Sequence, residues 1–237
     1  NETKVEKMNH KVPLDTRNEI KFIASSQDYH YLLKWIRLHP AGFYTVYPDR
    51  KVNNIYFDSH EYTAYADNLA GVSFRTKVRY RWYGSSLTPA AGALEIKCKR
   101  NLFVWKHIFK TSKAPYSPLA NWARVRQLLS SQMPLEAKKW MEENPLPILI
   151  NRYNRKYFLS QDGKVRVTID NKLVFFDQRF RPAPNIKQSA NNPDFFVVEF
   201  KFDRNDRELA SRYIQTIPIR ISKSSKYCNG LRFLSGN

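Results

Sequence analysis

The sequence of 237 residues is short of glycine and of cysteine. It has only 7 Gly, and neither the G-x-x-x-x-G-K-[ST] loop nor the G-x-G-x-x-G loop that cradles nucleotide phosphates occurs. The 2 Cys, Cys98 and Cys228, lie far apart without a C-x-x-C pair, which argues against a structural zinc site and fits a reducing compartment. No apolar run approaches the length that spans a bilayer. We therefore expect a cytoplasmic protein that does not use the common phosphate loops.

Acidic residues are also scarce. The chain has 40 Lys and Arg against 21 Asp and Glu, a formal net charge of +19 and a pI near 9.9. Such a field attracts polyanions, namely nucleic acid, anionic membranes or phosphate compounds, and composition alone does not choose among them. Hydrophobic residues make up 42% of the chain and aromatic residues 14%, which allows a sizeable core and favours strands.

Hydrophobic periodicity predicts an antiparallel α+β protein, because most strands are joined by short connections. Strands are predicted at 19–24, 52–58, 73–83, 94–100, 104–111, 149–160, 164–169, 173–177 and 195–203. Helices are predicted at 27–39, 61–69, 118–144 with a break at Pro134, 207–214 and 222–234. No linker is visible, so residues 1–237 are expected to form one domain, of which residues 1–16 are a frayed segment.

One predicted strand carries a cation at every second position from Arg75 to Arg81, with largely apolar residues between them. Alternate residues of a strand share a face, so these cations repel one another unless anions lie among them. A solvated face is the alternative for a single strand. However, the same pattern of one charged face and one apolar face recurs in other predicted strands. These strands carry Glu19 and Lys21, Glu95 and Lys97, Lys106, Arg155, Arg166 with Thr168 and Asp170, and Glu199 with Lys201.

These strands can close into a barrel of about eight strands with a polar, basic lumen and helices over its apolar outer face. Cations inside a lumen are costly to desolvate unless they are paired, and the few glutamates cannot pair with all of them. A polyanionic ligand can pair with the cations that the glutamates leave unmatched.

Several segments, in order, resemble the catalytic domain of the vacuolar transporter chaperone (VTC) family. They are Glu19–Phe22, Asn54–Asp58, Lys77–Gly84, Leu94–Lys97, Tyr153–Arg155, Val165–Val167, Val198–Lys201 and Ser222–Lys226. The resemblance runs from about Arg17 to Leu234. The VTC domain is a polyphosphate polymerase module of the triphosphate tunnel metalloenzyme (CYTH-like) superfamily, so the resemblance implies an antiparallel barrel whose tunnel holds a chain of phosphates.

The resemblance also implies an activity and a site. The activity is transfer of the terminal phosphate of ATP to a growing polyphosphate chain, with Mn²⁺ or Mg²⁺. The family's tunnel cations match Lys21, Arg79, Arg81, Lys97, Lys106, Arg155, Arg166 and Lys226, and its metal-binding glutamate matches Glu199. Of these, Arg79, Arg81, Lys97, Arg155 and Arg166 are the candidate catalytic residues. Arg75, Lys77 and Lys201 are further candidate phosphate ligands, and Glu19 and Glu95 either help to hold the metal or form ion pairs.

The triphosphatase branch of the superfamily opens with E-x-E-x-K, whereas this chain has Arg17 in place of the first glutamate. A tripolyphosphatase or nucleoside triphosphatase therefore stays open as the second hypothesis, and a non-catalytic polyphosphate binder as the third. Nucleic-acid binding is not expected, because many cations alternate with apolar residues inside strands. The family's inositol-phosphate-sensing and membrane domains are not seen, which leaves open a membrane partner outside this chain. Tyr56 and Asp58 are predicted to anchor a strand end.

Overall fold

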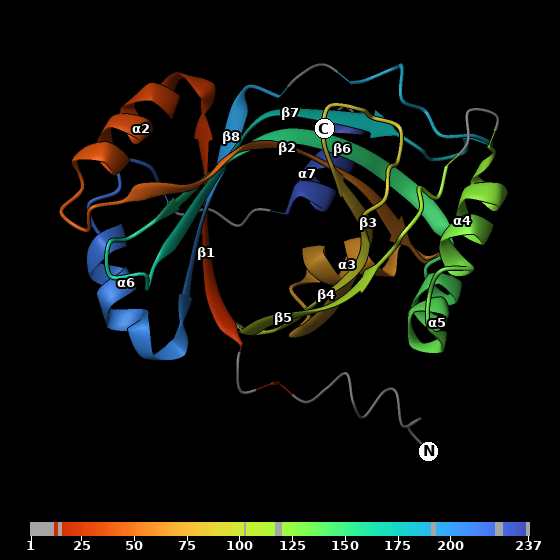
Figure 1. Cartoon of the computed structure of the whole chain (residues 1–237), viewed down its shortest axis with the longest axis horizontal. Coiled ribbons are helices and arrows are strands. Elements are labelled where there is room, and N and C mark those ends of the chain that lie inside the picture. Colours follow the sequence, from red (N-terminus) through yellow and green to blue (C-terminus); the bar gives the residue numbers. More distant parts are fainter. Residues whose placement is uncertain are drawn as a thin grey trace.

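The computed structural model describes residues 12–13, 16–101, 103–116, 120–190, 193–220 and 225–235. These residues contain eight strands (Figure 1). They are β1 (Arg17–Ser25), β2 (Tyr44–Asp58), β3 (Phe74–Tyr83), β4 (Ala93–Arg100), β5 (Phe103–Lys110), β6 (Leu146–Leu159), β7 (Arg166–Asp177) and β8 (Phe195–Asp203). The helices are α2 (Tyr29–Leu38), α3 (Thr63–Ala70), α4 (Trp122–Ser130), α5 (Leu135–Glu143), α6 (Arg207–Ile214) and α7 (Lys226–Leu234), with short 3₁₀ turns at Ser26–Asp28 and Arg204–Asp206.

The strands form one antiparallel sheet that closes on itself in the order β1-β5-β4-β3-β2-β6-β7-β8. Figure 1 shows the resulting ring, with helices at its two ends and around its wall. The prediction of an α+β protein with a closed antiparallel sheet is therefore confirmed. The seam is uneven: β1 pairs with β8 from Arg17 to Ser25, but among the described residues it pairs with β5 through Arg17 and Asn18 alone.

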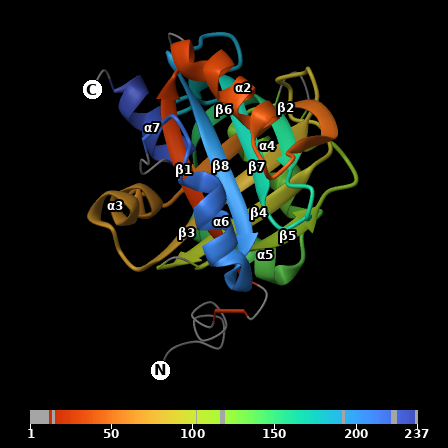
Figure 2. The same cartoon turned by 90° about the vertical axis from the view of Figure 1, so that its left-hand side faces the viewer.

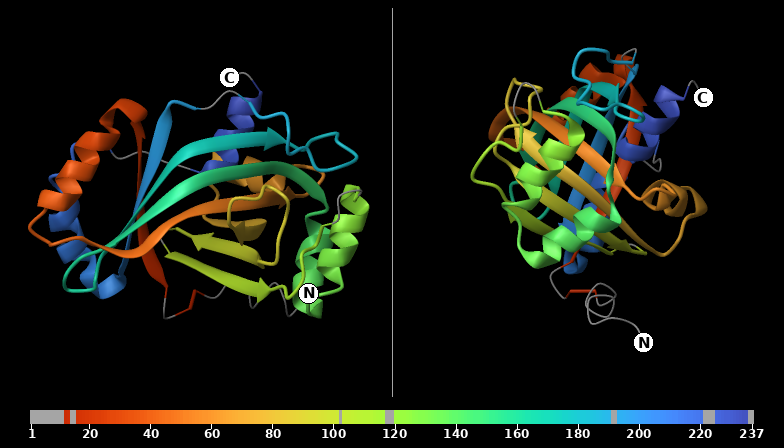
Figure 3. Two further views of the ribbon diagram at one scale, coloured as in Figure 1. Left: turned by 45° about the horizontal axis from the view of Figure 1, so that its top comes forward. Right: turned by 90° about the vertical axis from the view of Figure 1, so that its right-hand side faces the viewer.

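Two pairs of helices cover the apolar outer face of the ring. In the first pair, α2 and α6 pack Leu32, Ile36 and Ile214 against Phe22 and Phe200, and Figure 2 shows α6 lying along β8. The second pair, α4 and α5, lies at the opposite end of the ring (Figure 3). Because their apolar residues face the sheet, the inner face is left to the alternating polar residues.

Trp122, Leu129 and Trp140 of α4 and α5 pack against Tyr80 and Ile96 of β3 and β4. Asn121 caps α4 by accepting a hydrogen bond from the Arg124 amide, and Pro134 lies between the two helices, as predicted. The Trp side chains on these helices thus serve in packing.

The last helix, α7, packs against the inner side of the ring. Its Tyr227, Cys228 and Leu231 join an apolar cluster with inner-wall residues such as Leu149 and Phe175. Gly230 of α7 is needed for this contact, since a Cβ there would lie 2.5 Å from Leu149 Cδ2 and 2.9 Å from Phe175 Cδ1. The inner wall is therefore charged in one part and apolar where α7 lies.

Asp58 accepts hydrogen bonds from the amides of Ala64 and Tyr65 at the start of α3 and from the Tyr227 hydroxyl. It anchors the end of β2, as predicted, and it ties α3 and α7 to that end. Tyr56 stacks on Tyr227, with ring centroids 5.3 Å apart.

The predicted element boundaries differ most from the structure in two strands, and those of the other described elements differ by up to three residues. β7 is continuous from Arg166 to Asp177, whereas two strands, at 164–169 and 173–177, were predicted. β2 begins at Tyr44, eight residues before the predicted start at Val52. The predicted helix starts at 118 and 222, and residues 1–11 and 14–15 of the predicted frayed segment, lie outside the described residues. Among those that are described, no helix has the length and apolar character to cross a membrane.

Candidate functional site

The inner wall of the ring carries a network of charged side chains in two groups, one around Glu95 and one around Glu19, Glu199 and Asp170, which meet at Tyr153. Its cations come from β1, β3, β4, β5, β6, β8 and α7, and its carboxylates from β1, β4, β7 and β8. The cations are Lys21, Arg79, Arg81, Lys97, Lys106, Arg155, Lys201 and Lys226, and the carboxylates are Glu19, Glu95, Asp170 and Glu199. The structure thus brings together all but three of the residues proposed above.

Glu95 lies between three cations. It accepts hydrogen bonds from Arg79 Nε at 2.8 Å and Nη2 at 2.5 Å, and Arg81 and Lys106 lie 3.7 and 3.6 Å away. Burial by itself would raise the pKa of Glu95, but Arg79, Arg81 and Lys106 together hold that pKa well below its usual range. Glu95 is therefore a carboxylate that holds two arginines and a lysine in place.

Glu19 and Glu199 share their cations. Lys21 Nζ lies 3.3 Å from Glu19 and 3.4 Å from Glu199, and Lys201 Nζ lies 3.3 Å from Glu199. Lys97 donates to Glu19 at 2.8 Å. Burial lowers the pKa of both Lys21 and Lys97, and the pKa of Glu19 falls well below its usual range despite burial because Lys21, Lys97 and Lys201 surround it.

Asp170 is the carboxylate that was not predicted as a site residue. It is 0% exposed and accepts two hydrogen bonds from Arg155, at 2.6 and 2.7 Å, in the fork-to-fork geometry that suits a guanidinium. Lys226 Nζ, at the start of α7, lies 2.5 Å from Asp170 Oδ2, the oxygen that also accepts from Arg155 Nη2. Because Arg166, Thr168 and Asp170 alternate along one strand, the sequence does indicate that Asp170 faces the lumen with them.

Neutral side chains fix the orientation of Arg81. Its Nε donates to Asn54 Oδ1 at 2.8 Å, and Asn54 Nδ2 donates to Asn151 Oδ1 at 2.7 Å. Its Nη2 donates to the Tyr153 hydroxyl at 3.1 Å. Burial would raise the pKa of Tyr153, but Arg155 and Arg81 lower it to about 8. Asn54 was predicted to belong to a strand, and its polar role could not be read from that pattern.

The three remaining predicted cations lie at the margins of the network. Lys77 donates to Ser225 Oγ at 2.7 Å, and burial is the main cause that lowers its pKa to about 8. Arg75 follows on the same face of β3, and its buried Nε has no hydrogen-bond partner among the described residues. Arg166 is exposed at the first position of β7, opposite Lys201 in the register.

The predicted metal ligands do not form a cluster of carboxylates. Glu95 lies with Arg79, whereas Glu19 and Glu199 share Lys21, and within the described residues no group of three or more His, Cys, Asp or Glu could hold a metal ion. Thr168, 2% exposed, is the cross-strand partner of Glu199, and its Oγ1 has no hydrogen-bond partner in the part of the chain that the structure describes. One carboxylate beside a spare hydroxyl fits a cation that takes its other ligands from phosphates and water.

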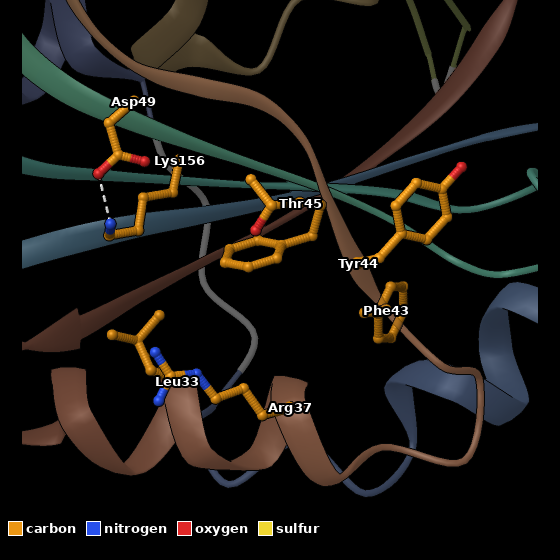
Figure 4. Close-up of a pocket in the computed structure, with 8 residues that line it drawn as sticks. Leu33, Arg37, Phe43, Tyr44, Thr45, Asp49 and Lys156 are labelled. Carbon is orange, nitrogen blue, oxygen red and sulfur yellow. Dashed lines mark hydrogen bonds and ion pairs between the residues drawn. The ribbon is translucent and has the colours of Figure 1, made fainter.

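A separate cavity of about 270 Å³ lies outside the lumen, between α2 and the start of β2 (Figure 4). Leu33, Arg37 and Phe43 line it, together with the ion pair of Lys156 and Asp49. None of the network residues borders it.

Solved structures with a similar fold are known. The structure is similar to HpAC1 from Hippeastrum, described as a proposed adenylyl cyclase with a dominant triphosphatase activity, with a TM-score of 0.54 and 14% identity over 94% of this chain and 96% of that one. A proposed adenylate cyclase from Vibrio parahaemolyticus gives a TM-score of 0.47 and 12% identity over 94% and 99%. At 14% identity, the likeness to HpAC1 concerns the fold alone. No curated protein sequence matches the chain.

A sequence-family model described as the VTC domain matches residues 16–235. That span contains the whole ring and every residue of the charged network. The chain therefore belongs to the VTC domain family.

Proposed function

We propose that this protein is a polyphosphate polymerase, which transfers the terminal phosphate of ATP to a growing polyphosphate chain inside its basic lumen. The observation that carries the proposal is the excess of cations over carboxylates in the inner network. Lys21, Lys97 and Lys201 share Glu19 and Glu199, so three ammonium groups face two carboxylates. A chain of phosphates supplies the missing negative charge along the length of the lumen.

The cost of leaving that charge unmatched is large. Moving an ionised group out of water costs several kcal/mol even after the protein relaxes around it. The lowered pKa of Lys201, about 8, and that of Lys77, also about 8, express this cost, because burial is the main cause in both. A phosphate chain relieves it, which makes binding of polyphosphate favourable.

The arginines are suited to hold the reacting phosphates. Arg79, Arg81 and Arg155 are pinned by Glu95, Asn54 and Asp170, so their planar forks are oriented before a ligand arrives. Phosphoryl transfer depends mainly on alignment and charge stabilisation. The attacking terminal phosphate is already ionised near neutral pH, so the transfer needs no general base.

Glu199 and Thr168 would hold a divalent cation, Mn²⁺ or Mg²⁺, which would neutralise the charge that develops on the leaving group. Lys21 and Lys201 form ion pairs with Glu199 and hold its side chain in the lumen. Lys97, Lys106 and Lys226 complete the cradle as point charges, and Lys77, Arg75 and Arg166 extend it.

A triphosphatase is the second candidate, and the likeness to HpAC1, whose description names a dominant triphosphatase activity, favours it. A hydrolase must orient and deprotonate a water. The cations around Glu19 and Glu95 lower the pKa of both carboxyl groups, so each of these two carboxylates is a weak base. This favours transfer to phosphate over transfer to water.

The test is incubation of the purified protein with ATP and Mn²⁺, followed by a gel stained for polyphosphate and an assay for free phosphate. A ladder of polymer supports the proposal. Release of free phosphate without polymer supports the triphosphatase, and binding of polyphosphate without turnover of ATP supports a non-catalytic binder. A pulldown on duplex DNA at moderate salt, expected to be negative, checks the exclusion of nucleic acid.

A further inference from the structure

Next to the arginine layer of the inner wall lies a layer of tyrosines around one exposed arginine. Along β3, Arg81 is followed two residues later by Tyr83, and along β6, Arg155 is followed by Tyr157. Residues two apart point to the same side of a strand and lie about 7 Å apart at a rise of ~3.3 Å per residue. Along both strands, the inward-facing side chains therefore change from arginine to tyrosine within two residues.

Strand β2 supplies the rest of this layer. Arg50 is the register partner of Arg155, and Tyr47 is the partner of Tyr157. The Arg50 guanidinium carbon lies 5.2 Å from the centroid of Tyr47, 5.9 Å from that of Tyr83 and 5.8 Å from that of Tyr157. We name Tyr47, Arg50, Tyr83 and Tyr157 the aromatic rim.

The aromatic rim stands open to solvent. Tyr47 is 43% exposed and Tyr83 is 50% exposed, and Arg50 is also exposed. Packing does not require these rings, since none of the three belongs to the clusters of buried apolar residues. Tyr157 connects the rim to the network, because Arg155, Tyr83 and Arg50 all influence its pKa, which burial raises.

The rings and the guanidinium of the aromatic rim lie two residues beyond Arg81 and Arg155, at a distance that suits the base of a nucleotide whose phosphates contact those arginines. A nucleoside triphosphate whose phosphates lie on Arg81 and Arg155 has its base one layer further out along the wall, where the rim lies. Bases stack on aromatic faces and on arginine planes regardless of base identity. We propose that the aromatic rim is a stacking site for the base of the donor nucleotide, so that the lumen takes nucleoside triphosphates in preference to inorganic tripolyphosphate.

This inference rests on the proposed function only for the position of the phosphates. It predicts weak choice among bases, because the rim offers ring faces and one guanidinium. ATP and GTP should bind within a few-fold of each other.

The experiment measures the binding of ATP and of inorganic tripolyphosphate to the full chain by calorimetry. Tyr47→Ser and Tyr83→Ser are compared with wild type and with a control, Tyr31→Ser, which removes an exposed tyrosine from α2 on the outer side. Thermal unfolding identifies any variant that fails to fold, and Tyr83→Phe keeps the ring where the serine variant is unstable. Each serine variant is expected to bind ATP about 10-fold more weakly, or about 1.4 kcal/mol, with tripolyphosphate binding changed less than 2-fold and Tyr31→Ser unchanged.

An equal loss for both ligands in the rim variants overturns the inference, and so does no loss for either ligand. Tyr83→Phe must bind ATP as wild type does, because a ring without its hydroxyl still stacks; a loss there also overturns it. Polymer formation from ATP by wild type is recorded in parallel. A protein that makes polymer yet shows no rim effect keeps the proposed function and loses the base site, whereas a rim effect without polymer does the reverse.

Discussion

Replacing Asp170 by Asn tests whether the lumen depends on carboxylates to hold its cations. The side chain is fully buried and neutralises both Arg155, through two hydrogen bonds, and Lys226, at 2.5 Å. The asparagine amide keeps the shape of the carboxylate but loses its charge. Its Nδ2 amino group replaces one carboxylate oxygen, so a hydrogen-bond donor then faces the cations. Removing one partner of a buried ion pair costs about 3–5 kcal/mol because the other charge stays buried and unmatched.

We expect Asp170→Asn to lower the free energy of unfolding by about 3 kcal/mol, the lower end of that range, since asparagine still accepts one hydrogen bond. For a chain of this length each kcal/mol corresponds to about 2–4 °C, so the melting temperature should fall by about 6–12 °C. Urea unfolding followed by fluorescence measures the first quantity and calorimetry the second. The control is Asp203→Asn, whose pair with Arg17 is mostly exposed and should contribute less than about 1 kcal/mol.

Phosphate should reverse part of this loss. In the variant, a bound polyanion meets two cations without a counterion, so polyphosphate should raise the melting temperature of Asp170→Asn more than that of wild type. A variant as stable as Asp203→Asn, or one that polyphosphate stabilises no more than wild type, would refute the reasoning.

The pH dependence has a definite sign. Burial would raise the pKa of Asp170, but Arg155 and Lys226 lower it below its unfolded value of about 3.9. Its contribution to stability is therefore present above the unfolded pKa and is lost as the pH falls toward the folded pKa. As the pH falls below about 4, the free energy of unfolding of wild type should decrease more steeply than that of Asp170→Asn.

Three further predictions concern the metal, the lysines and α7. Glu199→Gln should abolish turnover of ATP with Mn²⁺ while polyphosphate binding stays within a few-fold of wild type; unchanged turnover would remove Glu199 from the proposed metal site. The pKa values of Lys77 and Lys201 are lowered to about 8, so tripolyphosphate affinity should fall as the pH rises from 7 to 9.5, and binding near pH 8 should take up protons in calorimetry with two buffers. Affinity that stays constant over that range would contradict these values. Gly230→Ala should lower the free energy of unfolding by about 1–2 kcal/mol, because the added methyl overpacks the wall at Leu149; an equally stable variant would show that α7 can shift.

The sequence predicts the inner face of β3 and β4 well, because strict alternation there makes the face of each side chain unambiguous. It predicts β7 poorly. Lys172 has a positive φ of 50°, and the register of β6 with β7 shifts between Arg152 and Asn154. This irregularity moves the inward position from Asp170 to Leu173 and breaks the alternation, so the pattern indicated two strands where the ladder continues.

The start of β2 and the place of α7 could not be predicted for different reasons. The run from Tyr44 to Tyr47 has strand propensity, but Pro48 and Asp49 interrupt it, so the pattern does not join it to the strand at Val52. The pairing with β6 makes one continuous strand of the two parts. Helix α7 is amphipathic, which predicts a helix on a surface but not which surface. Its contact with the inner wall depends on Gly230, whose effect appears only when Leu149 and Phe175 are in place.

The carboxylates of the lumen have a consequence for how it takes up a ligand. Glu95 touches Arg79 closely but leaves Arg81 and Lys106 at 3.7 and 3.6 Å, beyond a good hydrogen bond. Each carboxylate is thus shared among cations that it orients without saturating their donors. Under the proposed function, incoming phosphate oxygens would join these cations without displacing the carboxylates. Binding would then avoid the cost of breaking buried pairs and would keep the arginines in the geometry that the proposed transfer needs.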